Sequence, residues 1–243
     1  MTLPPARTAL WSSIAETLVA EIARGHYRPG DKLPTESQLA TRFGVNRHTV
    51  RHAIQSLVQA GTLHSRRGSG VYVMAQPTDY PLGLRVRFHQ NITASGRTAS
   101  RHFNRMETRA SDAREAEALA LTEGAPVHVI EGVSLADGQP IALFRSVFPA
   151  GRFPDLLIHA AKHPSITAAL ADCGLSDYTR RTTRITARLA TAVQAASLRL
   201  SEGDAILRSE AVNADLSGQP VEYGLTWFAG DRVTLTHTPD STP

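Results

Sequence analysis

Residues 43–54 read FGVNRHTVRHAI, and this stretch combines the start of a helix with an excess of basic side chains. Asn46 is a residue type preferred at helix N-termini, and Arg47 and Arg51 follow it one turn apart on the predicted outer face. The helix dipole disfavours cations at that end. The same end presents unpaired N–H groups that suit an anion, and arginine pairs with guanine edges in the major groove. The stretch therefore predicts a helix that reads DNA through its first turns.

The predicted elements around this helix have the layout of a helix-turn-helix. Apolar residues at every fourth position predict a first helix with Leu10, Ile14, Leu18 and Ile22 on one face. Thr35 and Gln38 have capping-box spacing at the head of a short second helix, and the reading helix extends to about residue 60. Residues 62–74 predict two short strands joined by an Arg- and Gly-rich turn.

The excess of positive charge is confined to this first region. Residues 1–75 hold nine Lys and Arg against four Asp and Glu, whereas residues 76–243 hold seventeen against eighteen. This asymmetry indicates a small module that meets a polyanion and a larger one that does not. A solvated basic face is the alternative interpretation. The tight turn and the basic hairpin nearby favour double-stranded DNA as the partner.

The composition, 42% hydrophobic and 20% charged, is typical of a globular protein with a substantial core. No apolar run approaches the ~18 residues of a membrane span, and the first residues lack a secretory pattern. The single Cys173 cannot form an internal disulfide, which predicts a reducing, cytoplasmic location and a structural thiol. No zinc spacing, HExxH, G-x-S-x-G or P-loop is present. We therefore predict no catalytic residue, no metal and no cofactor.

The second region carries an internal repeat. Residues 119–148 match residues 198–228 with one inserted residue, and each copy reads as a helix end, a turn, a strand, a GQP turn and a second strand. Two such hairpins predict one sheet with internal pseudo-symmetry in an α+β fold. The Pro- and Gly-containing stretch before this region reads as a linker at 76–83. It separates a predicted DNA-binding domain at 1–75 from a second predicted domain at 84–243.

Residues 8–74 resemble the winged helix-turn-helix of GntR-family bacterial transcription regulators. The matching motifs are G-x-x-LP-[ST]-E-x-x-LA, FGV-x-R-x-TVR-x-A and RR-G-x-G-x-x-V. The remainder is similar to the chorismate-lyase-like UTRA effector domain of the HutC subfamily, and to its regulators of phosphonate utilisation. This resemblance implies that residues 84–243 form an effector-binding and dimerisation domain. The resemblance implies base or phosphate contacts from residues that match the family motif, a wing tip in the minor groove, and Ser37 in place of an arginine that some relatives carry. The predicted DNA-binding set is Thr35, Ser37, Asn46, Arg47, His48, Thr49, Arg51, Arg66, Arg67 and Gly68.

The effector would be a small anion. In RRTTRITAR, residues 180–188, Arg184 and Arg188 alternate with apolar residues that we expect to face the core, which leaves guanidinium groups for a phosphate or phosphonate. Glu222 and Tyr223 match positions that line the ligand cavity in the subfamily, although Gly132 and Phe144 replace a commonly charged pair. The predicted effector-binding set is Arg85, Arg87, His89, Arg184, Arg188, Glu222 and Tyr223.

These features predict a homodimeric, ligand-responsive repressor that binds a palindromic operator. The regulated genes would serve uptake or catabolism of phosphonates or phosphate esters. A regulator of the same family that senses a sugar phosphate or an amino-acid derivative is the main alternative. A lyase-like enzyme would require ligand turnover, and an architectural DNA binder would show no ligand-dependent change in operator affinity.

Overall fold

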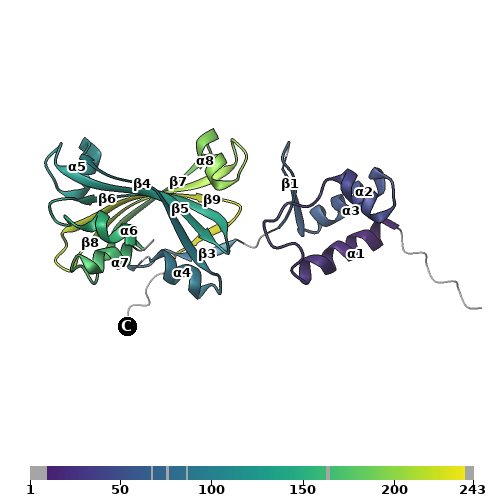
Figure 1. Cartoon of the computed structure of the whole chain (residues 1–243), viewed down its shortest axis with the longest axis horizontal. Coiled ribbons are helices and arrows are strands. Elements are labelled where there is room, and N and C mark those ends of the chain that lie inside the picture. Colours follow the sequence, from purple (N-terminus) through teal and green to yellow (C-terminus); the bar gives the residue numbers. More distant parts are fainter. Residues whose placement is uncertain (1–9, 67, 75–76, 86, 163–164, 239–243) are drawn as a thin grey trace, which may run out of the picture. The chain divides into compact units, whose positions relative to one another are not determined.

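The computed structural model of the chain describes residues 10–66, 68–74, 77–85, 87–162 and 165–238. The chain divides into two compact units, Met1–Gln76 and Pro77–Pro243, whose elements are labelled in Figure 1. The predicted domain boundaries stay a prediction. Four residues of the predicted linker, Thr78–Pro81, form strand β3, which pairs in parallel with β10 (Val233–Thr236). Thr78 and Tyr80 are buried and their neighbours are exposed, so this short segment alternates as a strand does.

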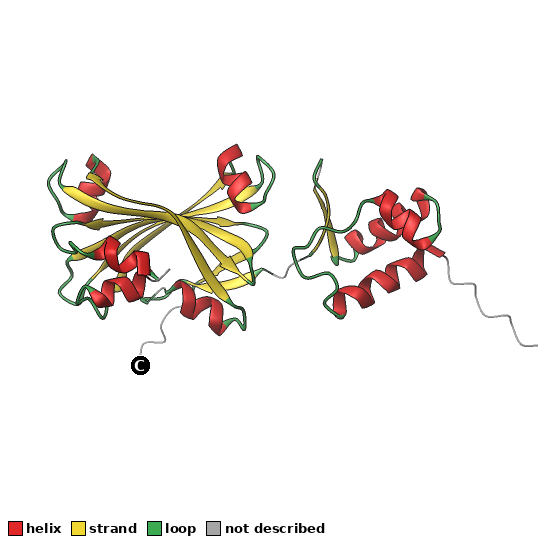
Figure 2. Ribbon diagram, viewed as in Figure 1, coloured by secondary structure: helices red, strands yellow, loops and turns green. Residues whose placement is uncertain are grey.

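In the first unit, the described residues form three helices and a hairpin (Figure 2). The helices are α1 (Leu10–Ala23), α2 (Glu36–Phe43) and α3 (Arg47–Gln59), and the antiparallel strands are β1 (Leu63–Arg66) and β2 (Gly70–Val73). The predicted helix-turn-helix with a following hairpin is confirmed.

Local capping fixes the turn between α2 and α3. Thr35 and Gln38 form the predicted capping box, which satisfies backbone N–H groups at the head of α2. Gly44 ends α2 with a φ of 64°, a left-handed conformation that glycine adopts without steric cost. Asn46 then caps α3 by accepting a hydrogen bond from the backbone N–H of Thr49. The turn is short because Gly44 ends α2 and Asn46, two residues later, caps the start of α3.

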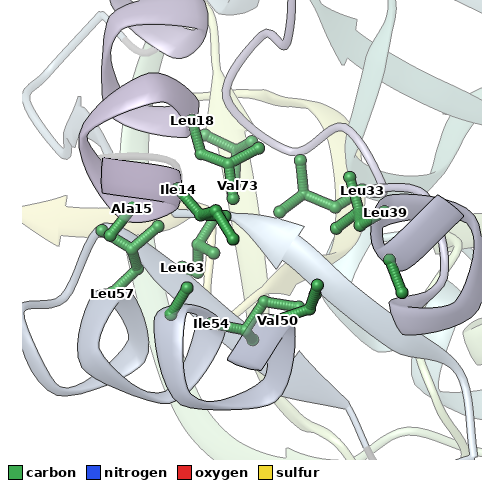
Figure 3. Packing of buried hydrophobic residues seen from close by; sticks show 12 residues of the cluster. Ile14, Ala15, Leu18, Leu33, Leu39, Val50, Ile54, Leu57, Leu63 and Val73 are labelled. Carbon is green, nitrogen blue, oxygen red and sulfur yellow. The ribbon is translucent and has the colours of Figure 1, made fainter. Parts of the chain in front are cut away.

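The core of the first unit is formed by side chains that converge from all three helices and both strands (Figure 3). Leu18, Leu39, Val50 and Leu63 have no exposed surface, and α1 packs mainly against α3. Leu10, predicted to share the buried face of α1, is instead 60% exposed. It is the first residue of the helix and lies before the turn that packs on the core.

The second unit is built on a six-stranded antiparallel sheet with the order β4-β5-β6-β9-β8-β7. Its strands are β4 (Ala99–Ala110), β5 (Pro126–Ala136), β6 (Gln139–Pro149), β7 (Thr179–Leu189), β8 (Ala205–Ala214) and β9 (Pro220–Ala229). Its helices are α4 (Phe88–Ala94), α5 (Ala113–Leu119), α6 (Leu156–Lys162), α7 (Ile166–Asp172) and α8 (Ala192–Leu198).

This sheet has the predicted internal pseudo-symmetry. Each half runs strand, helix, hairpin: β4-α5-β5-β6 in one half and β7-α8-β8-β9 in the other. The helices end alike, with Ala120 at φ 55° and Arg199 at φ 53°. The two halves join where β6 pairs with β9, so equivalent residues lie at mirrored positions along the strand order.

Helices cover the two faces of the sheet differently (Figure 1). Helices α5 and α8 lie on one face at its two ends, whereas α4, α6 and α7 lie on the other. Phe148 and Leu156 belong to the cluster under α6 and α7, and Ile92 of α4 packs near Phe228.

The expectation that one face of β7 belongs to the core is wrong. Ile185 is 44% exposed and Leu189 is 70% exposed. The reason is the position of β7 at the sheet edge, where it pairs only with β8 among the described strands. An alternating pattern identifies a strand, but it does not show that another layer covers it.

Candidate DNA-reading surface and effector cavity

The two arginines at the head of α3 are exposed, and each is held by a residue at the head of α2. Nη2 of Arg47 donates to Oγ of Ser37 over 2.8 Å. Nε of Arg51 donates to both carboxylate oxygens of Glu36, at 3.0 and 3.1 Å, and its Nη2 donates to Oε2 over 2.6 Å. The tight turn between the helices brings these four side chains together.

The pairing of Glu36 with Arg51 shifts the pKa values of both side chains. Hydrogen bonds from Arg51 lower the pKa of the Glu36 carboxyl, and the positive charges of Arg51 and Arg47 act in the same direction. The same hydrogen bonds raise the pKa of Arg51. Both groups are therefore charged at neutral pH, and the carboxylate lies beside the basic surface predicted to meet DNA.

Other predicted DNA-binding residues have structural roles as well. Oδ1 of Asn46 accepts from the backbone N–H and the hydroxyl of Thr49, at 2.8 and 2.9 Å. The Thr35 hydroxyl donates to Gln38 over 2.9 Å in its capping box. The Asn46 amide nitrogen is not used by the cap and can still donate to a base or phosphate.

The remaining predicted contacts lie on α3 and in the hairpin turn. His48 is exposed at the head of α3. His52, one turn further along, stacks on Trp11 of α1 with ring centroids 4.3 Å apart. Gly68 adopts φ 73° in the turn between β1 and β2. Arg67 lies outside the described residues, as does the side chain of Arg66, so the predicted wing contacts stay predictions.

A small cavity of ≈60 Å³ opens on the sheet face that carries α4 and α7. It lies below the ~300 to 1,000 Å³ typical of pockets for drug-sized ligands, which suits a small ligand. Strands from both halves of the sheet contribute to it. Its polar lining side chains are Tyr80, Arg87, Arg101, Ser146, Thr167, Tyr178, Arg180, Ser209, Asn213, Glu222 and Thr226.

Arg101 of β4 is a cation of this cavity that lies between two aromatic rings. Its guanidinium lies over the rings of Phe88 and Phe144, 4.6 Å from each centroid, and its Nε donates to Oγ of Ser134 over 3.1 Å. Among the described residues no carboxylate forms an ion pair with it. Burial lowers the pKa of Arg101, while Tyr80 and Glu222 act in the opposite direction. A ligand anion would supply the missing countercharge.

Arg180 of β7 occupies the pseudo-symmetric position. Its Nε donates to Oδ1 of Asn213 over 3.2 Å, as that of Arg101 donates to Ser134 on the equivalent strand. Nδ2 of Asn213 in turn donates to the buried carboxylate of Glu222 over 2.6 Å. The cavity thus combines two guanidinium groups with one carboxylate, so it can receive an anionic group and a hydrogen-bond donor at different points.

Arg87 closes one side of the cavity from the N-cap position of α4. Its Nη2 pairs with Asp177 over 2.8 Å, and its guanidinium lies 5.3 Å from the ring centroid of Tyr178. Its Nε is buried and has no hydrogen-bond partner among the residues that the structure describes. Burying an N–H donor without a partner is unfavourable, and an anion in the cavity would satisfy it.

The other predicted effector residues lie outside this cavity. Arg85 is exposed and pairs with Asp177 over 2.6 Å. His89 is half-buried beside Phe88, and burial followed by the charge of Arg101 lowers its pKa. Arg188 is exposed on β7. Of the predicted set, the structure brings only Arg87 and Glu222 into the cavity.

Arg184 and Tyr223 line a second, wider recess of ≈700 Å³. Glu210 of β8, which also lines it, points to the sheet face opposite Ser209 and Asn213, because successive strand residues alternate. Its carboxylate is already paired with Arg114 of α5 and accepts from the Tyr223 hydroxyl over 2.9 Å. Burial and then this hydrogen bond raise the pKa of Tyr223 to about 12. This recess therefore has less uncompensated charge than the cavity.

Sequence reasoning missed Arg101 and Arg180. The signal that could have found them is the internal repeat, because Arg101 and Arg180 are separated in sequence by the same distance as Leu119 and Leu198. Reasoning from β7 alone selected Arg184 and Arg188 instead. The structure also shows why position 132 carries no side chain. A Cβ there would lie 2.9 Å from Cζ of Phe144 and 2.1 Å from the backbone oxygen of His102.

No helix in the described part of the chain is long and apolar enough to cross a membrane. Among the same residues, no group of three or more His, Cys, Asp or Glu side chains is arranged to hold a metal ion.

Comparisons with known proteins cover both units. The family model described as bacterial regulatory proteins, gntR family, matches residues 10–73, and the UTRA domain model matches residues 94–234. The chain is 37% identical to the uncharacterized HTH-type transcriptional regulator RB1450 of Rhizobium meliloti (strain 1021), over 93% of each chain. It is 33% identical to the probable transcriptional regulator PhnF of Escherichia coli (strain K12), over 97% of each. The crystal structure of PhnF from Mycobacterium smegmatis matches with a TM-score of 0.66 and 28% identity, over 94% of this chain and all of that one.

Proposed function

Because the chain belongs to the GntR family of bacterial transcription regulators and carries a UTRA domain, we propose that it is a repressor whose operator affinity is set by a small anion bound in the Arg101 cavity. The observation that carries this proposal is the half-buried Arg101 guanidinium, which has no ion-pair partner among the described residues. Its relatives are transcription regulators rather than enzymes, and both of its domains are domains of such regulators. We further propose that it acts in the cytoplasm.

The charges of the cavity limit the chemistry of the effector. Burying a guanidinium without a countercharge is costly, so an oxyanion near Arg101 and Arg180 would be stabilised by charge-assisted hydrogen bonds. Glu222 would repel a second anionic group and attract an ammonium or hydroxyl donor. A phosphonate or phosphate ester with a donor at its other end satisfies both requirements. A sugar phosphate or an amino-acid derivative is the second candidate, because each also combines an anion with donors.

The DNA half of the proposal uses the exposed head of α3. One such helix reads a half-site, so a homodimer would read a palindromic operator. Coupling between the two ligands is reciprocal: if the effector weakens operator binding by some factor, the operator weakens effector binding equally. The regulated genes would serve uptake or breakdown of the compound that is sensed, consistent with the similarity to PhnF.

The experiment starts from the full chain and a random-core duplex library, from which an operator is selected. Binding to the selected duplex is then titrated with inorganic phosphate, methylphosphonate, 2-aminoethylphosphonate and glucose 6-phosphate. We expect at least one compound to change operator affinity, and Arg101→Met to abolish that change while leaving ligand-free operator affinity intact. Arg188→Met is the matched control, because Arg188 is exposed on β7. An operator affinity unchanged by all four compounds would contradict sensing of small phosphoryl anions.

A further inference from the structure

The Arg51 guanidinium is not only paired but also oriented. Glu36 engages its Nε and Nη2, at distances of 2.6 to 3.1 Å. An arginine has five N–H donors in a rigid plane, so this side-on pairing leaves both N–H groups of Nη1 and one of Nη2. That remaining end-on edge is the fork that matches O6 and N7 of guanine. Pairing with Glu36 therefore leaves the base-reading edge available and fixes the plane in which it lies.

Arg47 is held in a comparable way by the next residue of α2. Its Nη2 donates to the Ser37 hydroxyl over 2.8 Å, which uses one of its five donors. Ser37 is half-buried, whereas the Arg47 side chain it contacts is on the exposed surface. The two reading arginines, one turn apart on α3, are thus anchored to consecutive residues at the head of α2.

The anchors are themselves fixed. Thr35, the residue before Glu36, forms the capping box that sets the head of α2, and Leu39 and Ala40 of that helix are buried in the core. Flexible arginine side chains lose conformational entropy when a ligand orders them. Contacts that order them beforehand move that cost from DNA binding into folding.

We propose that Glu36 and Ser37 are positioning residues, which orient Arg51 and Arg47 before DNA arrives and thereby raise sequence discrimination rather than overall DNA affinity. This inference rests on the proposed DNA-binding function. The negative charge of Glu36 opposes attraction to phosphates, and phosphate attraction dominates non-specific binding. Glu36 therefore improves the ratio of specific to non-specific affinity while weakening non-specific binding.

The competing interpretation is an ordinary surface ion pair that supports the helix. Glu36 is the first residue of α2, where a carboxylate also interacts favourably with the helix dipole. A purely structural role would act on specific and non-specific binding alike, through the fraction of folded protein. It would also persist when Arg51 is absent. The two interpretations are therefore separated by the affinity ratio and by its dependence on Arg51.

The test uses the full chain, the selected operator duplex and a scrambled duplex of the same length, at one fixed salt concentration. We expect Glu36→Gln to lower the operator-to-scrambled affinity ratio about fivefold or more, the lower end of what a bidentate base contact discriminates. Affinity for the scrambled duplex stays equal or rises. Glu16→Gln is the matched control, because Glu16 is exposed on α1 and contacts Ser12 rather than a reading arginine.

A double-mutant comparison decides the mechanism. In an Arg51→Ala background, Glu36→Gln should leave the affinity ratio unchanged, because the side chain it orients is gone. Ser37→Ala should lower the ratio by a smaller factor, and that loss should disappear in an Arg47→Ala background. An unchanged ratio in Glu36→Gln, or an equal loss with and without Arg51, would overturn the inference. If the unmodified chain selects no sequence at all, the proposed function fails and this inference fails with it.

Discussion

The arginines proposed to bind ligands in the two units are compensated in opposite ways. On the first unit, Arg51 and Arg47 are exposed, yet each is engaged by a neighbouring side chain, Glu36 or Ser37. In the second unit, Arg101 lies half-buried between two aromatic rings and forms no ion pair with a described residue. Exposed cations are screened by water and cost little to leave unpaired, so their pairing serves orientation. A buried cation without a countercharge is costly, so it indicates a missing anion.

The largest expected effect concerns the support of the exposed arginines. Leu39 is fully buried in α2, directly behind the residues that hold them. Leu39→Ala should lower the free energy of unfolding of the first unit by ~2 to 5 kcal/mol, because it leaves a cavity in the core. Chemical unfolding of the full chain, followed by circular dichroism, measures this. Leu10→Ala is the control and should change stability by less than ~0.5 kcal/mol.

Removal of the buried cation should separate stability from ligand binding. Arg101→Met keeps much of the side-chain volume and removes the charge, so the free energy of unfolding should stay equal or increase by ~1 kcal/mol. Binding of the effector identified in the titration should weaken by ~1.5 to 3 kcal/mol, the value of a charge-assisted hydrogen bond. Thermal melts with and without ligand measure both quantities. A clear loss of stability in the ligand-free variant would show that the protein itself compensates this charge.

Removal of an exposed arginine should weaken operator binding and leave effector binding unchanged. Arg47→Ala should cost ~1 to 3 kcal/mol of operator affinity and relax selection at one base position, without affecting effector binding. Selection from the random-core library, repeated with the variant, reveals the relaxed position. An equal loss on every sequence would instead identify Arg47 as a phosphate contact.

The smallest effect concerns pH. Glu115 is buried and pairs with Arg109 over 2.6 Å, and this hydrogen bond holds its pKa below the ordinary 4.5. Because the folded-state pKa is the lower one, the stabilisation is fully present above pH ~4.5 and is lost as pH falls through the folded-state pKa. Unfolding midpoints at pH 7, 4.5 and 3 should fall more steeply in the unmodified chain than in Glu115→Gln. Parallel slopes would exclude this carboxylate as a source of the acid sensitivity.

Local signals predicted the first unit well because caps, helix period and charge all act over a few residues. The Thr35 capping box, the Asn46 cap and the exposed head of α3 follow directly from such signals. The pseudo-symmetric sheet was predictable because residues 119–148 and 198–228 have visibly similar sequences. The pairing partners of the reading arginines could not be predicted in this way, because Glu36 and Arg51 meet only through the angle of the turn between α2 and α3.

The effector cavity was harder to predict because it is assembled across the sheet. Arg101 and Glu222 come from strands far apart in the chain, and no local pattern states that they share a face. Arg184 and Arg188 have the better local pattern, but β7 lies at the sheet edge, where alternation does not reveal which face is enclosed. The arrangement of the strands, rather than any motif, decides which arginines line the cavity.

Gly132 and Phe144 face one another across β5 and β6, and the ring of Phe144 occupies the space that a Cβ at residue 132 would need. The same ring carries the Arg101 guanidinium. A side chain at position 132 would clash with the backbone oxygen of His102 as well as with the ring, and a smaller residue at 144 would leave a hole beneath the cation. The strand beside it therefore closes position 132 to any side chain, and the ring that supports the cation fills the space that the glycine leaves.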